Sequence, residues 1–120
     1  MEIPNEFKGL YEDGVIQIER LRAKKAIELE NYKQHIKAKL PEALHKYVDE
    51  KVFNISPKSF SIVFDDMATY LTIKIEKVFG TLNNIVNVDL SFHVCAPHKE
   101  KFITDDVLVA IAVLFGEKEP

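Results

Sequence analysis

Apolar residues recur at helical spacing through the first 50 residues of the chain. The positions that carry them, three to five residues apart, are Tyr11, Val15, Ile18, Leu21, Ala26, Leu29, Tyr32, Ile36, Leu40, Ala43 and Tyr47. A stripe with a period of 3.6 residues is typical of an amphipathic α-helix that lies on an apolar surface. We therefore predict that residues 5–52 are mostly helical.

Pro41 should interrupt this helical region near its C-terminal end. Proline has no backbone N–H and its ring clashes with the preceding turn, so a helix rarely runs through it unbroken. We expect the helix to break or kink after Lys39 or Leu40. A second helix should then run over Pro41–Lys51, with the proline in its first turn, where the missing donor does no harm.

The dipeptide Asp13-Gly14 is a second interruption in the helical pattern. Such a pair is a turn or capping signal, which predicts a short first helix over Asn5–Glu12 with Asn5 as its N-cap. Residues 15–18 are rich in β-branched side chains and follow this turn directly. A β-hairpin is therefore the alternative for this segment.

Beyond residue 54 the apolar period changes to two. Apolar and polar residues alternate over three segments: Ser59–Phe64, Leu71–Glu76 and Val86–Cys95. Strict alternation is typical of an antiparallel sheet that is covered on one face only. Turn residues lie between the segments, at Asp65-Asp66 and over Gly80–Asn84. The pattern thus predicts three strands in a meander.

The C-terminal segment Val107–Phe115 is apolar on every side of a helix. Thr104-Asp105-Asp106 precedes it with side chains that suit a helix N-terminus, and Gly116 is a stop signal. We predict a helix here, with a β-strand as the alternative because the segment is rich in β-branched residues. A helix that is apolar all round needs cover on more than one side.

Together these patterns predict a single α+β domain over residues 1–120, with the element order α-α-β-β-β-α. A long N-terminal helix, kinked near Pro41, and a C-terminal helix should pack on one face of a three-stranded antiparallel β-meander. The long helix would measure about 37 Å over residues 15–39, more than three strands can cover. The uncovered stripe and the apolar C-terminal helix together predict a homo-oligomer, most simply a homodimer.

Composition narrows the class of protein. The 120 residues are 47% hydrophobic and carry 16 basic and 19 acidic side chains, a net charge of −3, which excludes disordered and low-complexity chains. Cys95 is the single cysteine, so a disulfide-stapled scaffold is excluded. The longest apolar run is too short to span a membrane, and no signal-peptide pattern is present. We expect a cytoplasmic protein without a membrane partner.

Three histidine and cysteine side chains suggest chemistry, but the patterns are incomplete. His93, Cys95 and His98 are possible zinc ligands, yet a structural zinc site uses four ligands in two spaced pairs. Asp89, Ser91 and His93 alternate along one strand face, but the serine lies between the acid and the histidine, whereas a catalytic triad needs the histidine in the middle. No glycine spacing suits a phosphate loop. We expect no catalytic, cofactor or metal site.

Charge is distributed unevenly along the chain. Residues 20–39 carry a net charge of +5, and the rest of the chain carries −8. A basic helix on an acidic body can bind a phosphate backbone or an acidic protein. The predicted open face of the sheet has few charges, which is typical of an interface. The candidate partner-binding residues are therefore Arg20, Arg22, Lys24, Lys25, Lys33 and Lys37 on the helix and Asp89, Ser91 and His93 on the sheet.

These features favour a non-enzymatic protein–protein interaction module that acts as a homodimer. Such a module would be an adaptor, assembly component or inhibitor, of the kind frequent among phage and mobile-element accessory proteins. The alternative is nucleic-acid binding through the basic helix 20–39. Residues 41–115 are similar in element order to the double-stranded-RNA-binding domain, but Thr104-Asp105-Asp106 stands where that family has a lysine cluster that grips phosphates.

Overall fold

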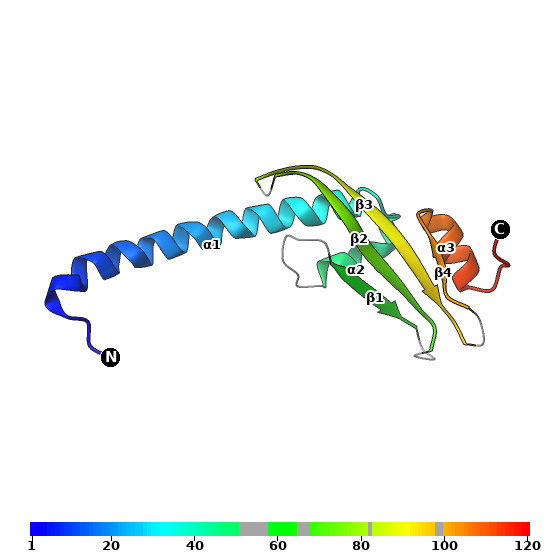
Figure 1. Cartoon of the computed structure of the whole chain (residues 1–120), viewed down its shortest axis with the longest axis horizontal. Helices are drawn as coiled ribbons and strands as arrows, with labels where there is room; N and C mark the ends of the chain where they lie inside the picture. The colour runs from blue at the N-terminus through cyan, green and yellow to red at the C-terminus, as the bar shows by residue number, and fades with distance from the viewer. Residues whose placement is uncertain (51–57, 65–67, 82, 98–99) are drawn as a thin grey trace.

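One long helix dominates the N-terminal third of the chain. The computed structural model describes residues 1–50, 58–64, 68–81, 83–97 and 100–120. A short 3-10 helix, η1 (Asn5–Phe7), leads directly into α1 (Lys8–Lys37), which has 30 residues and is about 45 Å long. The N-terminal part of α1 projects from the rest of the molecule (Figure 1).

The break predicted at Asp13-Gly14 is wrong, because both residues lie inside α1. Neither the separate helix over Asn5–Glu12 nor the alternative hairpin forms. Asn5 is not an N-cap either, since it is the first residue of η1 and Phe7 occupies the N-cap position of α1. A glycine inside a helix costs only about 1 kcal/mol relative to alanine, which the leucine, glutamate and lysine residues around it outweigh.

Pro41 does interrupt the helical region, although the elements around it differ from those predicted. α1 ends at Lys37, and Pro41 is the N-cap of η2 (Glu42–Leu44), which leads into α2 (His45–Asp49). The His45 Nε2 lies 2.9 Å and 3.0 Å from the carbonyl oxygens of Lys37 and Leu40 and donates to them, so it caps the end of α1.

The sheet has four antiparallel strands in the order β1-β2-β3-β4. They are β1 (Ser59–Val63), β2 (Tyr70–Thr81), β3 (Asn84–Cys95) and β4 (Phe102–Thr104). The α+β class and the antiparallel sheet are confirmed, but the three-stranded meander and the order α-α-β-β-β-α are wrong. A strand of three residues is too short to show an alternation, so β4 left no pattern to find. The predicted turn at Asp65-Asp66 lies outside the described residues.

The extra strand also removes the topological similarity to the double-stranded-RNA-binding domain. β4 pairs with residues 92–94 of β3. Along the chain it comes between β3 and α3 (Val107–Leu114). The order after Pro41 is therefore one helix, four strands and a second helix, counted over the described residues. RNA binding gains no support from this order of elements.

α3 is a helix, as predicted, and the strand alternative is wrong. The Asp106 carboxylate accepts hydrogen bonds from the backbone N–H groups of Leu108 and Val109 and so caps the N-terminus. Gly116 has a φ of 116°, and its N–H and that of Glu117 donate to carbonyls of the last turn. This arrangement is a Schellman motif, in which glycine takes the left-handed conformation that ends a helix.

One apolar cluster joins the helices to one face of the sheet. Residues that alternate along β2 and β3 are buried, whereas those between them are half-buried or exposed. Among the described residues, one face of the sheet is therefore covered and the other is open. From α1, the Tyr32 and Ile36 side chains are fully buried in this cluster, and Val48 of α2 and Ala110 of α3 join them. Burial raises the pKa of Tyr32 to about 12.

The molecule is much longer than its mass requires. Its principal extents are 69 × 32 × 21 Å and its radius of gyration is 20.1 Å, against about 14 Å for a compact domain of this length. The projecting part of α1 accounts for this excess (Figure 1). No helix among the described residues is both long and apolar enough to cross a membrane.

We call the sheet together with α2 and α3 the body. Two isoleucines of α1 should report how far the body covers this helix. Ile36 is fully buried and Ile27 is 72% exposed. We expect Ile36→Ala to lower the free energy of unfolding by about 2–5 kcal/mol, because it leaves a cavity, and Ile27→Ala to change it by less than about 0.5 kcal/mol. Urea denaturation measures both values. Equal losses would contradict this placement of α1.

The cap of α3 can be tested with two adjacent aspartates. Asp106→Ala removes the acceptor of two backbone N–H groups and should destabilise the fold by about 1 kcal/mol. Asp105→Ala is the control, because Asp105 is exposed and caps nothing. Chemical denaturation of the two variants should separate them, and a larger loss for Asp105→Ala would show that the cap is assigned to the wrong residue.

Candidate interaction surfaces

The six basic candidates all lie on α1 but do not form one face. Successive residues of an α-helix are rotated by about 100°, so Arg20 and Arg22 point in nearly opposite directions. Lys33 and Lys37 lie on the packed part of the helix and are half-buried, and Lys37 forms an ion pair with Asp49 of α2. The structure therefore separates these residues into two groups rather than joining them in one basic surface.

The candidates on the sheet, Asp89, Ser91 and His93, lie on one face of β3. We call this the outer face, because the alternate residues Phe92 and Val94 point into the core on the other face. The Ser91 Oγ donates to Glu76 Oε1 at 2.6 Å, and His93 Nε2 lies 3.3 Å from the same Ser91 oxygen. Because Ser91 uses its proton toward Glu76, His93 must donate to Ser91 through Nε2–H. Asp89 is separate from this chain of contacts and faces Lys77 across the ladder.

Glu76 is a member of this group that the sequence analysis missed. A β-bulge in β2 leaves Glu76 opposite no residue, between the pairs Ile75↔Leu90 and Lys77↔Asp89. The sequence does carry a sign of the bulge. The apolar alternation through Leu71, Ile73 and Ile75 continues at Val78 rather than at residue 77, which is the shift that one extra residue produces.

Two pKa shifts follow from this arrangement. The hydrogen bond from Ser91 lowers the pKa of Glu76, and the Lys74 ammonium, 3.7 Å away, adds to that effect. Partial burial lowers the pKa of His93, and the positive charges of Lys101 and Lys74 lower it further. Both causes favour the neutral imidazole of His93 over its charged form.

The order of these contacts differs from that of a catalytic triad. In a triad the serine hydroxyl donates to the histidine, and the histidine in turn donates to the acid. Here the serine lies between the two other groups and its proton points to Glu76, whereas the sequence pattern had placed Asp89 in the role of the acid. The geometry suits a polar cross-strand cluster that holds side chains in place.

The zinc candidates can be placed only in part. His93 and Cys95 lie on β3, but His98 lies outside the described residues. Cys95 faces Tyr70 across the ladder, and a hydrogen bond with that cysteine raises the pKa of Tyr70. Among the residues that the structure describes, no group of three His, Cys, Asp or Glu side chains could hold a metal ion.

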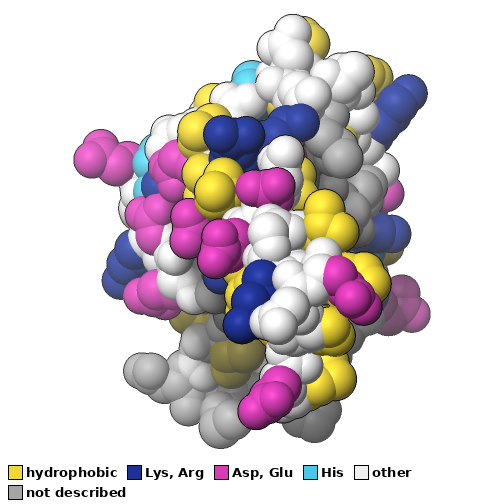
Figure 2. Space-filling model, turned by 90° about the vertical axis from the view of Figure 1, so that its left-hand side faces the viewer, with side chains coloured by type: hydrophobic (Ala, Val, Ile, Leu, Met, Phe, Trp, Pro, Cys, Tyr) yellow, Lys and Arg dark blue, Asp and Glu magenta, His cyan; other side chains and the backbone are white. Residues whose placement is uncertain are grey.

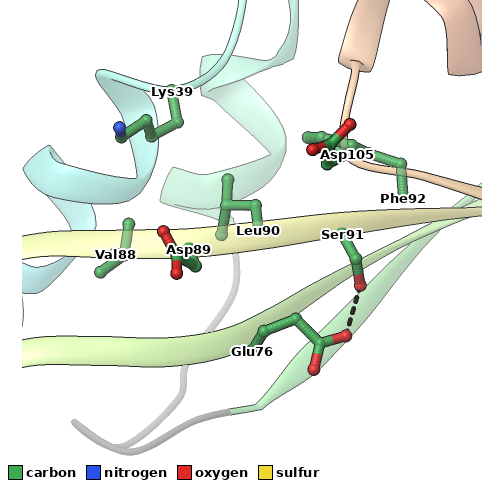
Figure 3. Close-up of a pocket in the computed structure, with 8 residues that line it drawn as sticks. All are labelled: Lys39, Glu76, Val88, Asp89, Leu90, Ser91, Phe92 and Asp105. Carbon is green, nitrogen blue, oxygen red and sulfur yellow. Dashed lines mark hydrogen bonds between the residues drawn. The ribbon is translucent and has the colours of Figure 1, made fainter.

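A hollow of about 480 Å³ follows one edge of β3. β4 pairs only with residues 92–94, so no described strand continues the sheet beside Asn84–Ser91. Lys39 and Asp105 lie on one side of this edge, and Glu76 and Ser91 lie on the other (Figure 3). Three carboxylates and one ammonium line the hollow, which gives it a negative charge.

A second hollow, of about 350 Å³, is almost wholly apolar. It lies between α2, α3 and the end of β1, with Leu44, Tyr47 and Leu108 among its walls. The Phe64 and Phe115 rings meet edge to face at its border, with centroids 5.3 Å apart. Leu108 and Phe115 are exposed, so α3 is not covered on every side within one chain.

Exposed apolar side chains recur along the projecting helical region, from Phe7 of η1 into α1. Those on one side of the helix are Phe7, Leu10, Tyr11, Ile18 and Leu21. We call these five residues the arm stripe. Continued along α1, the same side carries Leu29, Tyr32 and Ile36, which pack into the core. Figure 2 shows the end of the molecule from which α1 projects, with apolar side chains exposed between acidic and basic ones.

The outer-face hydrogen bond yields a prediction for the titration of Glu76. Ser91→Ala removes the donor that lowers the pKa of Glu76, so that pKa should rise toward its usual value. Because the folded-state pKa lies below the unfolded one, the stability that this bond contributes is present above the unfolded pKa and is lost as pH falls through the folded one. NMR titration of the carboxyl carbons measures the shift.

Ser61→Ala is the matched control for this titration. Ser61 lies on the same face and hydrogen-bonds Thr72, at 2.8 Å between the two oxygens. It is not one of the groups that shift the pKa of Glu76. Its removal should leave the pKa of Glu76 unchanged. If both alanine variants raised that pKa equally, the cause would be a general change in the sheet rather than the Ser91 hydrogen bond.

Comparison with known proteins adds no relationship to this description. No family model matches the sequence, and no curated protein or solved structure is significantly similar to the chain. The function proposed below therefore rests on the geometry and chemistry of this chain alone.

Proposed function

We propose that this chain is a non-enzymatic protein–protein interaction module in which the projecting part of α1 docks against a partner protein. The observation that carries the proposal is the arm stripe, which extends the core-facing side of α1 by about four turns beyond the body. A cytoplasmic location belongs to the proposal, because the single cysteine supports no disulfide within the chain.

The spacing of the arm stripe suits docking by a helix. Partners that receive an amphipathic helix read anchors at i, i+3 or i+4 and i+7. Leu10 and Tyr11 follow Phe7 by three and four residues, and Ile18 follows Tyr11 by seven. Contiguous exposed apolar surface of this kind is uncommon on a monomer and marks interaction sites. Each anchor that leaves water on docking contributes about 25 cal/mol per Å² of apolar area.

The body supports the arm by holding α1 at its C-terminal end. Tyr32 and Ile36 anchor the helix in the core. His45 donates to the carbonyl of Lys37, the last residue of α1, and to that of Leu40 just beyond it. The ion pair between Lys37 and Asp49 joins α1 to α2. Because the helix is already formed and oriented, docking costs less conformational entropy than the ordering of a flexible segment would.

Nucleic-acid binding through the basic helix remains the alternative proposal, with less support. Four basic residues, Arg20, Arg22, Lys24 and Lys25, lie on the projecting part of α1, but they point to several sides of it. A phosphate backbone is bound best by a basic stripe along one face. The apolar stripe on the same segment favours a protein partner.

Two isoleucines two residues apart provide a matched test of the docking side. Ile18 lies on the arm stripe and is 49% exposed, whereas Ile16 is 47% exposed and points to the opposite side. Serine at either position removes the same side chain and costs similar helix propensity. The experiment uses three immobilised baits: wild type, Ile18→Ser and Ile16→Ser. Each bait is incubated with nuclease-treated lysate of the source cells, to which a tagged copy of the wild-type chain has been added.

We expect one or more proteins, the tagged chain included, to be retained by wild type and Ile16→Ser and lost with Ile18→Ser. Circular dichroism should show that all three baits are folded. Retention that is identical on the three baits would reject the arm stripe as the docking side. A parallel incubation omits the nuclease, and retention seen only in that untreated lysate would favour the nucleic-acid alternative.

A further inference from the structure

Among the described residues, no contact explains why position 14 is a glycine. It lies in the middle of α1 with a φ outside the left-handed region, and a Cβ added there would meet no atom within 4 Å. Glycine inside a helix costs about 1 kcal/mol relative to alanine. Among the described residues, neither a turn nor a close contact requires it, which leaves position 14 open to the close approach of a second chain.

Gly14 lies at the centre of the arm stripe. Phe7 and Leu21 are seven residues away on either side, and Leu10 and Ile18 are four residues away. By the rotation of about 100° per residue, these five positions share an arc of about 80°, with Gly14 in its middle. Helices that cross in contact use such a set, the residue at the crossing point together with its neighbours at ±4 and ±7.

The charges of α1 change sign at the same residue. Residues 1–13 carry four carboxylates and one lysine, a net charge of −3, and residues 15–25 carry four basic side chains and one glutamate, a net charge of +3. Two copies side by side in parallel would place like charges together. Two antiparallel copies would place each acidic half beside a basic half.

The apolar positions are spaced equally on both sides of Gly14, and the charges change sign there. We therefore propose that the arm stripe docks on a second copy of the same chain, with the two α1 helices antiparallel and crossing on a two-fold axis at Gly14. Leu21 of each copy then lies near Phe7 of the other, and Ile18 lies near Leu10. The absent side chains of the two Gly14 residues let the backbones approach closely. This inference rests on the proposed function, because it takes the arm stripe as the docking surface.

The lengths of the elements are compatible with this pairing. A two-fold axis at Gly14 brings the first residues of one chain beside residues 24–27 of the other, where α1 meets the β2–β3 turn at Asn83. This pairing places the two bodies at opposite ends of the helix pair. Two crossing helices bury less than roughly 1,200 Å², so we expect a dimer of modest affinity in which charge matters.

The first measurement is the molar mass of the full chain by light scattering over a range of concentrations. We expect it to rise toward twice 13.8 kDa, with a dissociation constant that increases about threefold or more between about 50 mM and about 500 mM salt, because salt screens the antiparallel charge pairing. A chain that stays monomeric at all concentrations would overturn the inference, and a dimer that is equally tight at both salts would contradict the charge pairing.

Cysteine cross-linking tests the geometry directly, in a background in which Cys95→Ser removes the native thiol. Under mild oxidation Gly14→Cys should form a disulfide between copies, because a residue on a two-fold axis faces itself. Gly9→Cys is the matched control, since Gly9 also has open space around it but points away from the arm stripe. Phe7→Cys mixed with Leu21→Cys should form the mixed dimer in preference to either homodimer.

The remaining outcomes separate this inference from the proposed function. Disulfides of Phe7→Cys with itself would show parallel pairing, which overturns the antiparallel geometry and leaves the docking side intact. Cross-linking of Gly9→Cys as fast as Gly14→Cys would show random collision and would overturn the crossing point. A monomeric chain whose arm retains a different protein in the lysate experiment would reject self-pairing alone, whereas a monomer that binds nothing would reject both.

Discussion

The burial of Tyr32 and Ile36 beneath the sheet is the contact on which the rest of the molecule depends. These two side chains join α1 to the core that β2, β3 and α3 also share. Because a helix is stiff, anchoring its last two turns sets the direction of the whole element. The projection of the arm stripe into solvent, the separation of the basic residues and the position of Gly14 all follow from that single packing arrangement, reinforced by the cap from His45.

The outer face of the sheet depends on a different constraint, the bulge in β2. One extra residue brings Glu76 beside Ser91, and the resulting hydrogen bonds use the Ser91 hydroxyl and the Nε2 atom of His93 internally. A face whose polar groups already have partners offers fewer free donors and acceptors to a ligand. This is why the arm stripe, rather than Asp89, Ser91 and His93, carries the proposed function.

Much of the fold could be predicted from local pattern. Alternation over residues 59–64, 71–76 and 86–95 predicted three strands, and the residues before Val107 and after Phe115 predicted both ends of α3. Both signals depend on residues that are neighbours in the sequence. β4 could not be predicted, since three residues show no period. The break predicted at Asp13-Gly14 does not form, because a turn signal is only a local preference and a helix of 30 residues overrides it.

The sequence by itself determined the helical stripe, the sheet alternation, the caps of α3 and the charge reversal along α1, since each of these depends on residues close together in the chain. Only the tertiary structure decided which part of the stripe is buried, because that depends on where the sheet ends relative to α1. It also decided the meeting of Glu76 with Ser91 across two strands. The apolar stripe of α1 can be read from nearby residues, but the length of the surface that covers the stripe depends on contacts between distant parts of the chain.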